Sequence, residues 1–200
     1  MKSSMTHTLW NVPNVLTMLR VVFAIGIFAL LPFKLYAVCI ALFLLAAATD
    51  FFDGYLARKY HLITVFGRIM DPFADKLLIC GCFIYLCAIP ELRIPWGIHP
   101  WMAVVIFGRE MLITSLRAIV EQGGGDFSAK WIGKWKMGLQ CVAVPACLLF
   151  LIFPGSLCVK SIMLLSLWGT VLITIYSGIT YIRNAINAIY ANNNDYPGKF

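Results

Sequence analysis

Long apolar stretches separated by short polar segments run through the whole chain. Six of them are long enough to supply the 20 or so apolar residues that a helix needs to cross a bilayer. They cover residues 12–31, 35–57, 65–89, 100–120, 135–153 and 159–182. The pattern predicts an all-α integral membrane protein with six transmembrane helices. It leaves no room for a separate soluble domain, so we expect one transmembrane domain over residues 1–190 and a polar C-terminal tail over 191–200.

Composition supports the membrane prediction. Of the 200 residues, 61% are hydrophobic and only 12% are charged, and the mean hydropathy is +0.84. These values lie far outside the range of soluble globular domains.

The basic residues predict the orientation, because loops on the cytoplasmic side carry an excess of Lys and Arg. Nine lie near the two termini and in the segments at 58–68 and 122–136, and three lie on the opposite side. The nine are Lys2, Arg58, Lys59, Arg68, Lys130, Lys134, Lys136, Arg183 and Lys199, and the three are Lys34, Arg93 and Lys160. We therefore expect both termini in the cytoplasm.

The net charge of +7 raises the question of nucleic-acid binding. The Lys and Arg residues occur singly at the ends of apolar runs and form no basic stripe, which is unlike a nucleic-acid surface. Anionic lipid headgroups and anionic substrates are the expected partners, and no nucleic acid is expected.

Four carboxylates interrupt the second and third apolar stretches, in the segment TDFFDGYLARKYHLITVFGRIMDPFADK (49–76). At 3.6 residues per turn, Asp50 and Asp53 share one side of a helix, and Asp71 and Asp75 share one side of the next. The short turn between these helices makes them antiparallel neighbours. The four carboxylates are thus predicted to converge on one pocket near the cytoplasmic interface.

Closely spaced carboxylates repel one another unless something neutralises them. Pairing with Arg58, Arg68 and Lys76 would do so, as would exposure of the whole turn to the headgroup layer. Four acids paired by helical period on adjacent helices favour a third interpretation, in which two divalent cations balance four negative charges. Oxygen ligands suit Mg²⁺ or Mn²⁺.

Small residues adjoin the acids. Gly54 and Ala57 leave a smooth strip on the second helix, and Gly67 opens the approach to the third. Close helix packing would account for Gly54 and Ala57. Beside a metal cluster, we favour room for a flat or bulky ligand.

The spacing of these residues resembles the signature of the CDP-alcohol phosphotransferase family. The motif reads Asp50, two residues, Asp53-Gly54, two residues, Ala57-Arg58, eight residues, Gly67, three residues, Asp71, three residues, Asp75. The surrounding segments NVPNVLTMLR, GREMLITSLRAI and SAKWIGKWKM are also similar to members of this family. The similarity covers nearly the whole length and is least after about residue 140.

The resemblance implies a six-helix enzyme, usually a homodimer, that displaces CMP from a CDP-linked lipid with an alcohol. It implies a multi-pass protein of the bacterial cell membrane with its active site facing the cytoplasm. Asp50, Asp53 and Asp71 would be the principal ligands of two divalent cations, with Asp75 near the metals and acting as general base. The residues expected to border the cytidine diphosphate are Asp53, Gly54, Ala57, Arg58, Gly67 and Thr17.

The expected substrates are CDP-diacylglycerol and sn-glycerol 3-phosphate, and a phosphorylated acceptor needs cations for its phosphate. Candidate residues are Arg109, Arg117, Lys134, Lys136 and Arg20. An ion pair with Glu110 is the alternative for Arg109, and snorkelling to the interface is the alternative for the others. Asn14, Thr17 and Arg20 recur at helical spacing and form a polar stripe on the first helix. The family similarity favours a substrate-cavity role for Thr17 and Arg20.

Met137 departs from the small hydroxylated residue expected after the GKWK run, which leaves this side of the acceptor pocket open. The same chemistry with phosphatidylglycerol, inositol phosphate or serine as acceptor also fits the motif. A divalent-cation transporter is the alternative from another class, because intramembrane acids also mark ion pathways. It predicts acids on several helices near the midplane, whereas these cluster on one helical hairpin.

Overall fold

The computed structural model describes residues 12–60, 65–122 and 131–195, with the side chains of residues 14–50, 67, 69–117 and 135–186. Over these residues the chain forms helices and no strands, which confirms the predicted all-α class. The long helices are α2 (Val12–Leu30), α3 (Tyr36–Tyr60), α4 (Val65–Ala88), α5 (Pro100–Gln122), α6 (Trp131–Ile152) and α7 (Leu157–Asp195). Two short 3-10 helices, η1 (Leu31–Phe33) and η2 (Pro90–Leu92), follow α2 and α4.

Each predicted apolar stretch corresponds to one of these long helices, but the ends of the helices differ from the ends of the stretches. Helix α6 begins at Trp131, before the apolar run, and α7 continues beyond Ile182 to Asp195. Residues 191–195 of the expected tail are therefore helical. Hydropathy located the apolar part of each helix and not its polar ends.

Three segments of the described chain are long and apolar enough to cross a membrane: Asn14–Phe33, Trp135–Ile152 and Leu157–Ile186. The apolar part of α3, Tyr36–Asp50, is shorter. Helices α4 and α5 carry several charged residues, which lowers their hydropathy. The chain is thus a multi-pass membrane protein, and crossing by all six helices stays a prediction.

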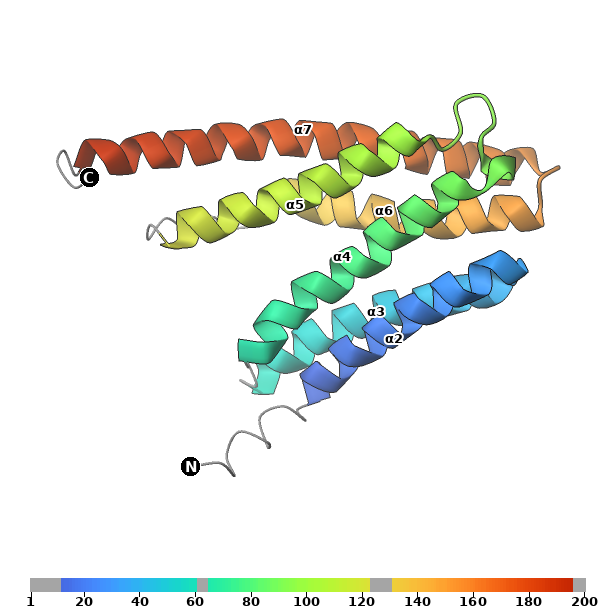
Figure 1. Ribbon diagram of the computed structural model, residues 1–200, viewed down its shortest axis with the longest axis horizontal. Helices are drawn as coiled ribbons and strands as arrows, with labels where there is room; N and C mark the ends of the chain where they lie inside the picture. Colours follow the sequence, from blue (N-terminus) through green and yellow to red (C-terminus); the bar gives the residue numbers. More distant parts are fainter. Residues whose placement is uncertain (1–11, 61–64, 123–130, 196–200) are drawn as a thin grey trace.

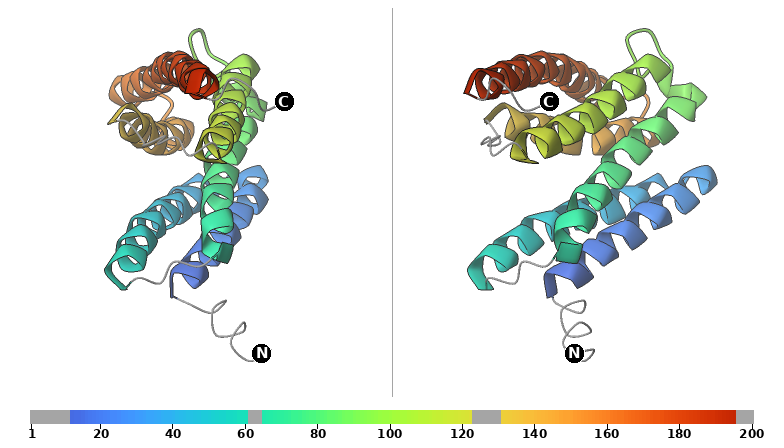
Figure 2. Two further views of the ribbon diagram at one scale, coloured as in Figure 1. Left: turned by 90° about the vertical axis from the view of Figure 1, so that its left-hand side faces the viewer. Right: turned by 60° about the vertical axis from the view of Figure 1, so that its left-hand side comes forward.

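The helices form two groups joined by α4 (Figure 1). Helices α2 and α3 pack along each other, and α4 crosses α2 and reaches α5. Helices α5, α6 and α7 form the second group, and α3 contacts α6 between the groups. Figure 2 shows the same division from two further directions. Successive long helices alternate in direction, so the end of α3 and the start of α4 lie at the same end of the molecule as the end of α5 and the start of α6 (Figure 1).

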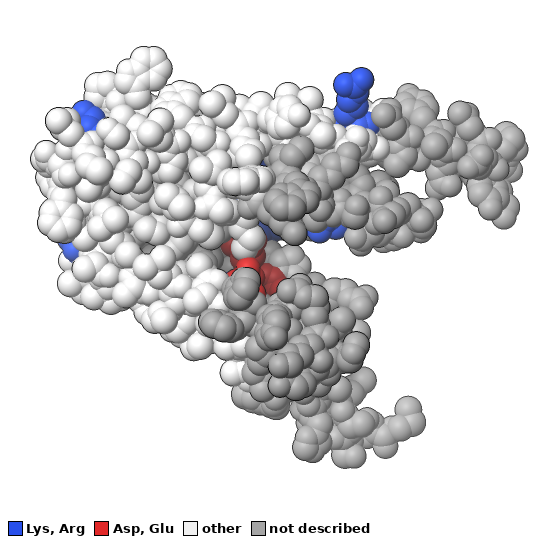
Figure 3. Space-filling model, turned by 180° about the vertical axis from the view of Figure 1, so that it is seen from behind, with Lys and Arg blue, Asp and Glu red and all other residues white. Residues whose placement is uncertain are grey.

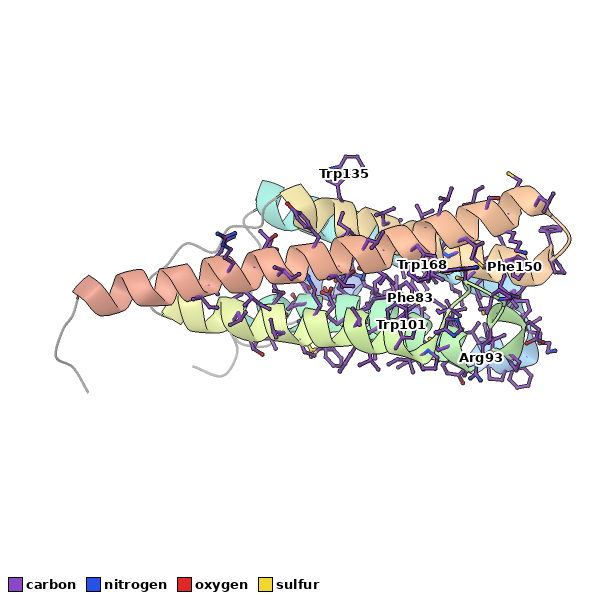
Figure 4. All side chains as sticks on the ribbon, turned by 90° about the horizontal axis from the view of Figure 1, so that it is seen from above. Phe83, Arg93, Trp101, Trp135, Phe150 and Trp168 are labelled. Atoms are coloured by element: carbon purple, nitrogen blue, oxygen red, sulfur yellow. The ribbon has the colours of Figure 1, made fainter. Side chains whose placement is uncertain are left out.

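Aromatic side chains pack at the opposite end. Trp168 Nε1 donates a hydrogen bond to the Trp96 carbonyl oxygen at 2.9 Å, and the Trp101 and Trp168 ring centroids are 6.1 Å apart. These contacts connect α7 to the start of α5 and to the segment that precedes it. Figure 4 shows Trp135 projecting away from the helices, in the manner of an interfacial anchor.

Candidate active site

The acidic residues predicted to converge come from α3 and α4. Asp50 lies near the end of the apolar part of α3, and Asp71 and Asp75 lie one turn apart in α4. Asp75 is within electrostatic range of Asp50. Figure 3 shows acidic atoms gathered where the surface is hollowed, with Lys and Arg atoms on the facing wall. Asp53 belongs to α3, and its side chain lies outside the described residues.

Helix α2 supplies polar partners for two of these acids. Thr17 Oγ1 donates a hydrogen bond to Asp71 Oδ1 at 2.5 Å, and Arg20 Nη1 lies 2.8 Å from Asp50 Oδ1. The Arg20 side chain is only 1% exposed. A buried guanidinium is costly unless a carboxylate compensates it. The polar stripe of α2 therefore faces the acids.

Sequence reasoning did not identify the partner of Asp50. It considered Arg58, Arg68 and Lys76 as neutralising cations, whereas Arg20 makes the ion pair. Lys76 Nζ donates a hydrogen bond to Thr114 Oγ1 on α5. The side chains of Arg58 and Arg68 lie outside the described residues. The signal for Arg20 was its helical spacing from Thr17, which predicted a shared face but no partner.

A second charged group, the basic cluster, consists of Arg109, Glu110 and Lys136. Glu110 Oε1 lies 3.3 Å from Arg109 Nη1 and also forms an ion pair with Lys136 Nζ on α6. The Arg109 guanidinium lies over the Tyr181 ring of α7, 5.4 Å from its centroid. All three charged side chains are nearly buried, and together they carry one net positive charge.

Both interpretations of Arg109 are compatible with this geometry, because its pairing with Glu110 leaves the cluster positive. The bond from Lys136 to Glu110 joins residues 26 positions apart and was not predicted. An acid inside an apolar helix needs a partner. The position of Glu110 in such a helix was the only signal in the sequence for its pairing with Lys136.

The acids and the basic cluster are neighbours. Asp75 is within electrostatic range of Lys136 and Glu110 as well as Arg20. Arg117 is half-buried, two turns beyond Glu110 on α5, and its Nε atom is buried without a hydrogen-bond partner among the described residues. The Lys134 side chain lies outside the described part of α6.

The residues predicted to border the nucleotide are only partly described. Gly67 is buried in the first turn of α4. Gly54, Ala57 and Arg58 belong to α3, but the structure describes only their backbone.

The donor set suits a hard divalent cation. Asp50, Asp71 and Asp75 offer only carboxylate oxygens, which Mg²⁺ and Mn²⁺ prefer. Among the described side chains, no three His, Cys, Asp or Glu residues are close enough to share one ion, and Asp53 was not part of that set. The fit to the predicted metals rests on residue type alone, because carboxylate oxygens are the ligands that these ions prefer.

Helices that bury acids and bases together near one end define an integral membrane protein with a charged intramembrane site. Comparison with known sequences identifies the family: the model described as CDP-alcohol phosphatidyltransferase matches residues 10–176, and the chain belongs to this family.

Curated relatives carry specific enzyme names. The CDP-diacylglycerol–glycerol-3-phosphate 3-phosphatidyltransferase of Bacillus subtilis is 37% identical over 153 residues, which cover 76% of this chain and 75% of the relative. A probable phosphatidylglycerophosphate synthase of Mycobacterium tuberculosis is 36% identical over 186 residues, 90% of this chain and 83% of the relative. A Rickettsia felis protein with the first name is 34% identical over 179 residues, 86% of this chain and 94% of the relative.

Proposed function

We propose that this protein transfers the phosphatidyl group of CDP-diacylglycerol to sn-glycerol 3-phosphate, giving phosphatidylglycerophosphate and CMP. The printed names of relatives that align over most of both chains support this reaction. The observation that carries the choice of acceptor is the basic cluster within electrostatic range of Asp75. Cations beside the reacting centre suit an acceptor that bears a phosphate.

The reaction exchanges the phosphoanhydride bond of the diphosphate for a new phosphate ester bond. The acceptor hydroxyl oxygen bonds to the phosphorus that bears diacylglycerol, the bond from that phosphorus to the CMP oxygen breaks, and CMP leaves with the electron pair. Asp75 takes the proton of the attacking hydroxyl. A carboxylate that lies near another acid and several cations is suited to accept that proton, provided that it lies within hydrogen-bond reach of the hydroxyl.

Members of this family generally depend on divalent cations, and two Mg²⁺ or Mn²⁺ ions are the proposed cofactors here. Asp50, Asp53, Asp71 and Asp75 would bind them. When bound, such ions neutralise a diphosphate and stabilise a departing phosphate. Thr17 and Arg20 orient Asp71 and Asp50 from α2.

The remaining site residues divide by substrate. The cytidine diphosphate would be bordered by Thr17, Asp53, Gly54, Ala57, Arg58 and Gly67. The acceptor phosphate would be bound by Arg20, Arg109, Arg117, Lys134 and Lys136. The burial of Arg109 and Lys136 supports the second group, because a charge-assisted hydrogen bond is stronger away from water.

The proposed setting is a bacterial inner membrane crossed by six helices, with both termini and the active site on the cytoplasmic side. A single domain over residues 1–190 and a homodimer complete the proposal. The excess of basic residues at one end of the helices supports this orientation.

The test is CMP release by the purified full-length protein in mixed micelles. We expect release from CDP-diacylglycerol with sn-glycerol 3-phosphate and Mg²⁺, and loss of release when EDTA removes the metal, with recovery after Mg²⁺ is restored. Phosphatidylglycerol, inositol phosphate and serine serve as competing acceptors. A faster reaction with one of these would contradict the proposed choice of acceptor. CMP release that is insensitive to EDTA would contradict the proposed metal requirement.

A further inference from the structure

A stripe of buried polar residues follows one face of α7. Its members are spaced by four, four, three and four residues, the period of a single helix face. They are Ser166, Thr170, Thr174, Ser177 and Tyr181, and each is at most 5% exposed. Polar groups inside a membrane helix are costly unless they are hydrogen-bonded.

Only part of this stripe bonds to its own backbone. Ser166 donates to the Met163 carbonyl oxygen and Ser177 to that of Thr174. The hydroxyl oxygens of Thr170 and Thr174 are buried and have no hydrogen-bond partner among the described residues. The same holds for Nε2 of Gln140 on α6, a residue that is 2% exposed. Buried polar atoms normally have partners, so these three atoms are available to a polar group that is not part of the described chain.

The close contacts of two glycines place these three residues at neighbouring levels of α6 and α7. A Cβ added at Gly169 would lie 3.6 Å from Leu139 Cδ1, so α6 and α7 meet at the level of Gln140 and Thr170. A Cβ at Gly178 would lie 3.4 Å from Arg109 Cγ. Thr174, one turn from both Thr170 and Gly178, therefore lies between Gln140 and the basic cluster.

The same region borders the acids. Lys136 precedes Gln140 by one turn, a rise of about 6 Å, which is comparable with the length of a three-carbon phosphate ester. Cys141, the residue after Gln140, is within electrostatic range of Asp75 and Asp50. Gln140, Thr170 and Thr174, here called the neutral seam, thus adjoin both the basic cluster and the acids.

We propose that the neutral seam is a subsite for the non-reacting hydroxyl group of the acceptor alcohol. This inference rests on the proposed function. In sn-glycerol 3-phosphate, a secondary hydroxyl lies between the phosphate and the attacking primary hydroxyl. The basic cluster binds the phosphate, Asp75 faces the primary hydroxyl, and an amide donor with two threonine hydroxyls binds the group between them.

The test compares two acceptors that differ only in that hydroxyl: sn-glycerol 3-phosphate and 3-hydroxypropyl phosphate. The wild-type kcat/KM is expected to favour the glycerol ester by about tenfold or more, because a site built to bind a hydroxyl rejects an analogue without it. In Gln140→Leu and Thr174→Val the preference falls several-fold, while the KM for CDP-diacylglycerol is unchanged. Thr174→Ser, which keeps the hydroxyl, retains most of the preference.

The matched control is Thr180→Val, on the same helix, where the hydroxyl is exposed and donates to the Tyr176 carbonyl oxygen. It leaves both acceptor rates unchanged. If Gln140→Leu slows both acceptors equally, or lowers only the melting temperature, the seam serves helix packing and the inference is wrong. If the wild-type protein releases no CMP with either acceptor, the proposed function fails and the inference fails with it.

Discussion

At the scale of single residues, two ion pairs join charged side chains of the site across different helices. Arg20 pairs with Asp50, and Lys136 pairs with Glu110. Desolvation makes such charges costly to leave unpaired. The pairing also keeps carboxylates and cations a short distance apart. A substrate with both a phosphate and a hydroxyl therefore finds cations for its phosphate and a carboxylate for its hydroxyl within one site.

The first prediction at this scale concerns the general base. Asp75→Asn removes the proton acceptor but keeps the size of the side chain, so CMP release falls about 10²- to 10⁴-fold. Binding of a cytidine nucleotide, measured by calorimetry, is retained. The control is Glu91→Gln, which changes an exposed acid in η2, beyond the end of α4, and keeps full activity. Full activity of Asp75→Asn would show that another group takes the proton.

Lys136→Met tests the acceptor phosphate. Removal of one charged hydrogen bond raises the KM for sn-glycerol 3-phosphate about tenfold or more, and the KM for CDP-diacylglycerol stays within twofold, or about 0.4 kcal/mol. Steady-state kinetics with each substrate varied in turn measure the two effects. The control, Lys160→Met, changes an exposed lysine near the start of α7. Equal increases in the KM values of both substrates would show that Lys136 does not bind the acceptor phosphate.

At the scale of helices, close approach of α2 and α4 positions Asp71 against Thr17. The Phe28 ring packs directly on the backbone of Gly81 and stacks on Tyr85, with centroids 5.9 Å apart. A Cβ at Gly81 would lie 2.2 Å from Phe28 Cζ. A larger residue at this crossing therefore forces the Phe28 ring or α2 to shift.

Gly81→Ala consequently lowers the free energy of unfolding, by about 1–3 kcal/mol. Gly108→Ala is the matched control, because a Cβ there meets nothing within 4 Å among the described residues, and alanine favours a helix by about 1 kcal/mol. Thermal unfolding in detergent micelles measures both. A Gly81→Ala protein as stable as Gly108→Ala would show that Phe28 moves aside without cost.

At the scale of the whole molecule, the alternating helices bring the end of α3 and the start of α4 to the same end as the end of α5 and the start of α6, here called the site end, and Trp101 and Trp168 pack toward the other. The proposed orientation puts the site end in the cytoplasm. All seven cysteines belong to the described chain, and Cys158, at the start of α7, is the exposed one. It belongs to the end opposite the acids.

Cys158 therefore reports orientation. A membrane-impermeant maleimide is expected to label it in intact spheroplasts and not in inside-out vesicles. Cys158→Ser abolishes the labelling and serves as the control, because the other cysteines are buried or half-buried. Labelling in inside-out vesicles alone would reverse the proposed topology.

Much of the fold was predictable because the information is local. The apolar runs predicted one long helix each, since a helix in a bilayer needs a continuous apolar segment. Helical periodicity also placed Asp71 with Asp75, and Thr17 with Arg20, on shared faces. The ends of α6 and α7 were not predictable from hydropathy, because polar residues continue a helix as readily as they end it.

The sequence alone determined where the apolar helices lie and which residues of one helix share a face, because both depend on spacing along the chain. It predicted the residues that carry the chemistry and the approach of acids from two consecutive helices, and Asp50 does lie within electrostatic range of Asp75. Only the tertiary structure decided the partners. Thr17 and Asp71 are 54 positions apart, and Lys136 and Glu110 are 26 apart. Which buried charges meet depends on how helices cross, and helix crossing is set by side-chain packing over the whole molecule.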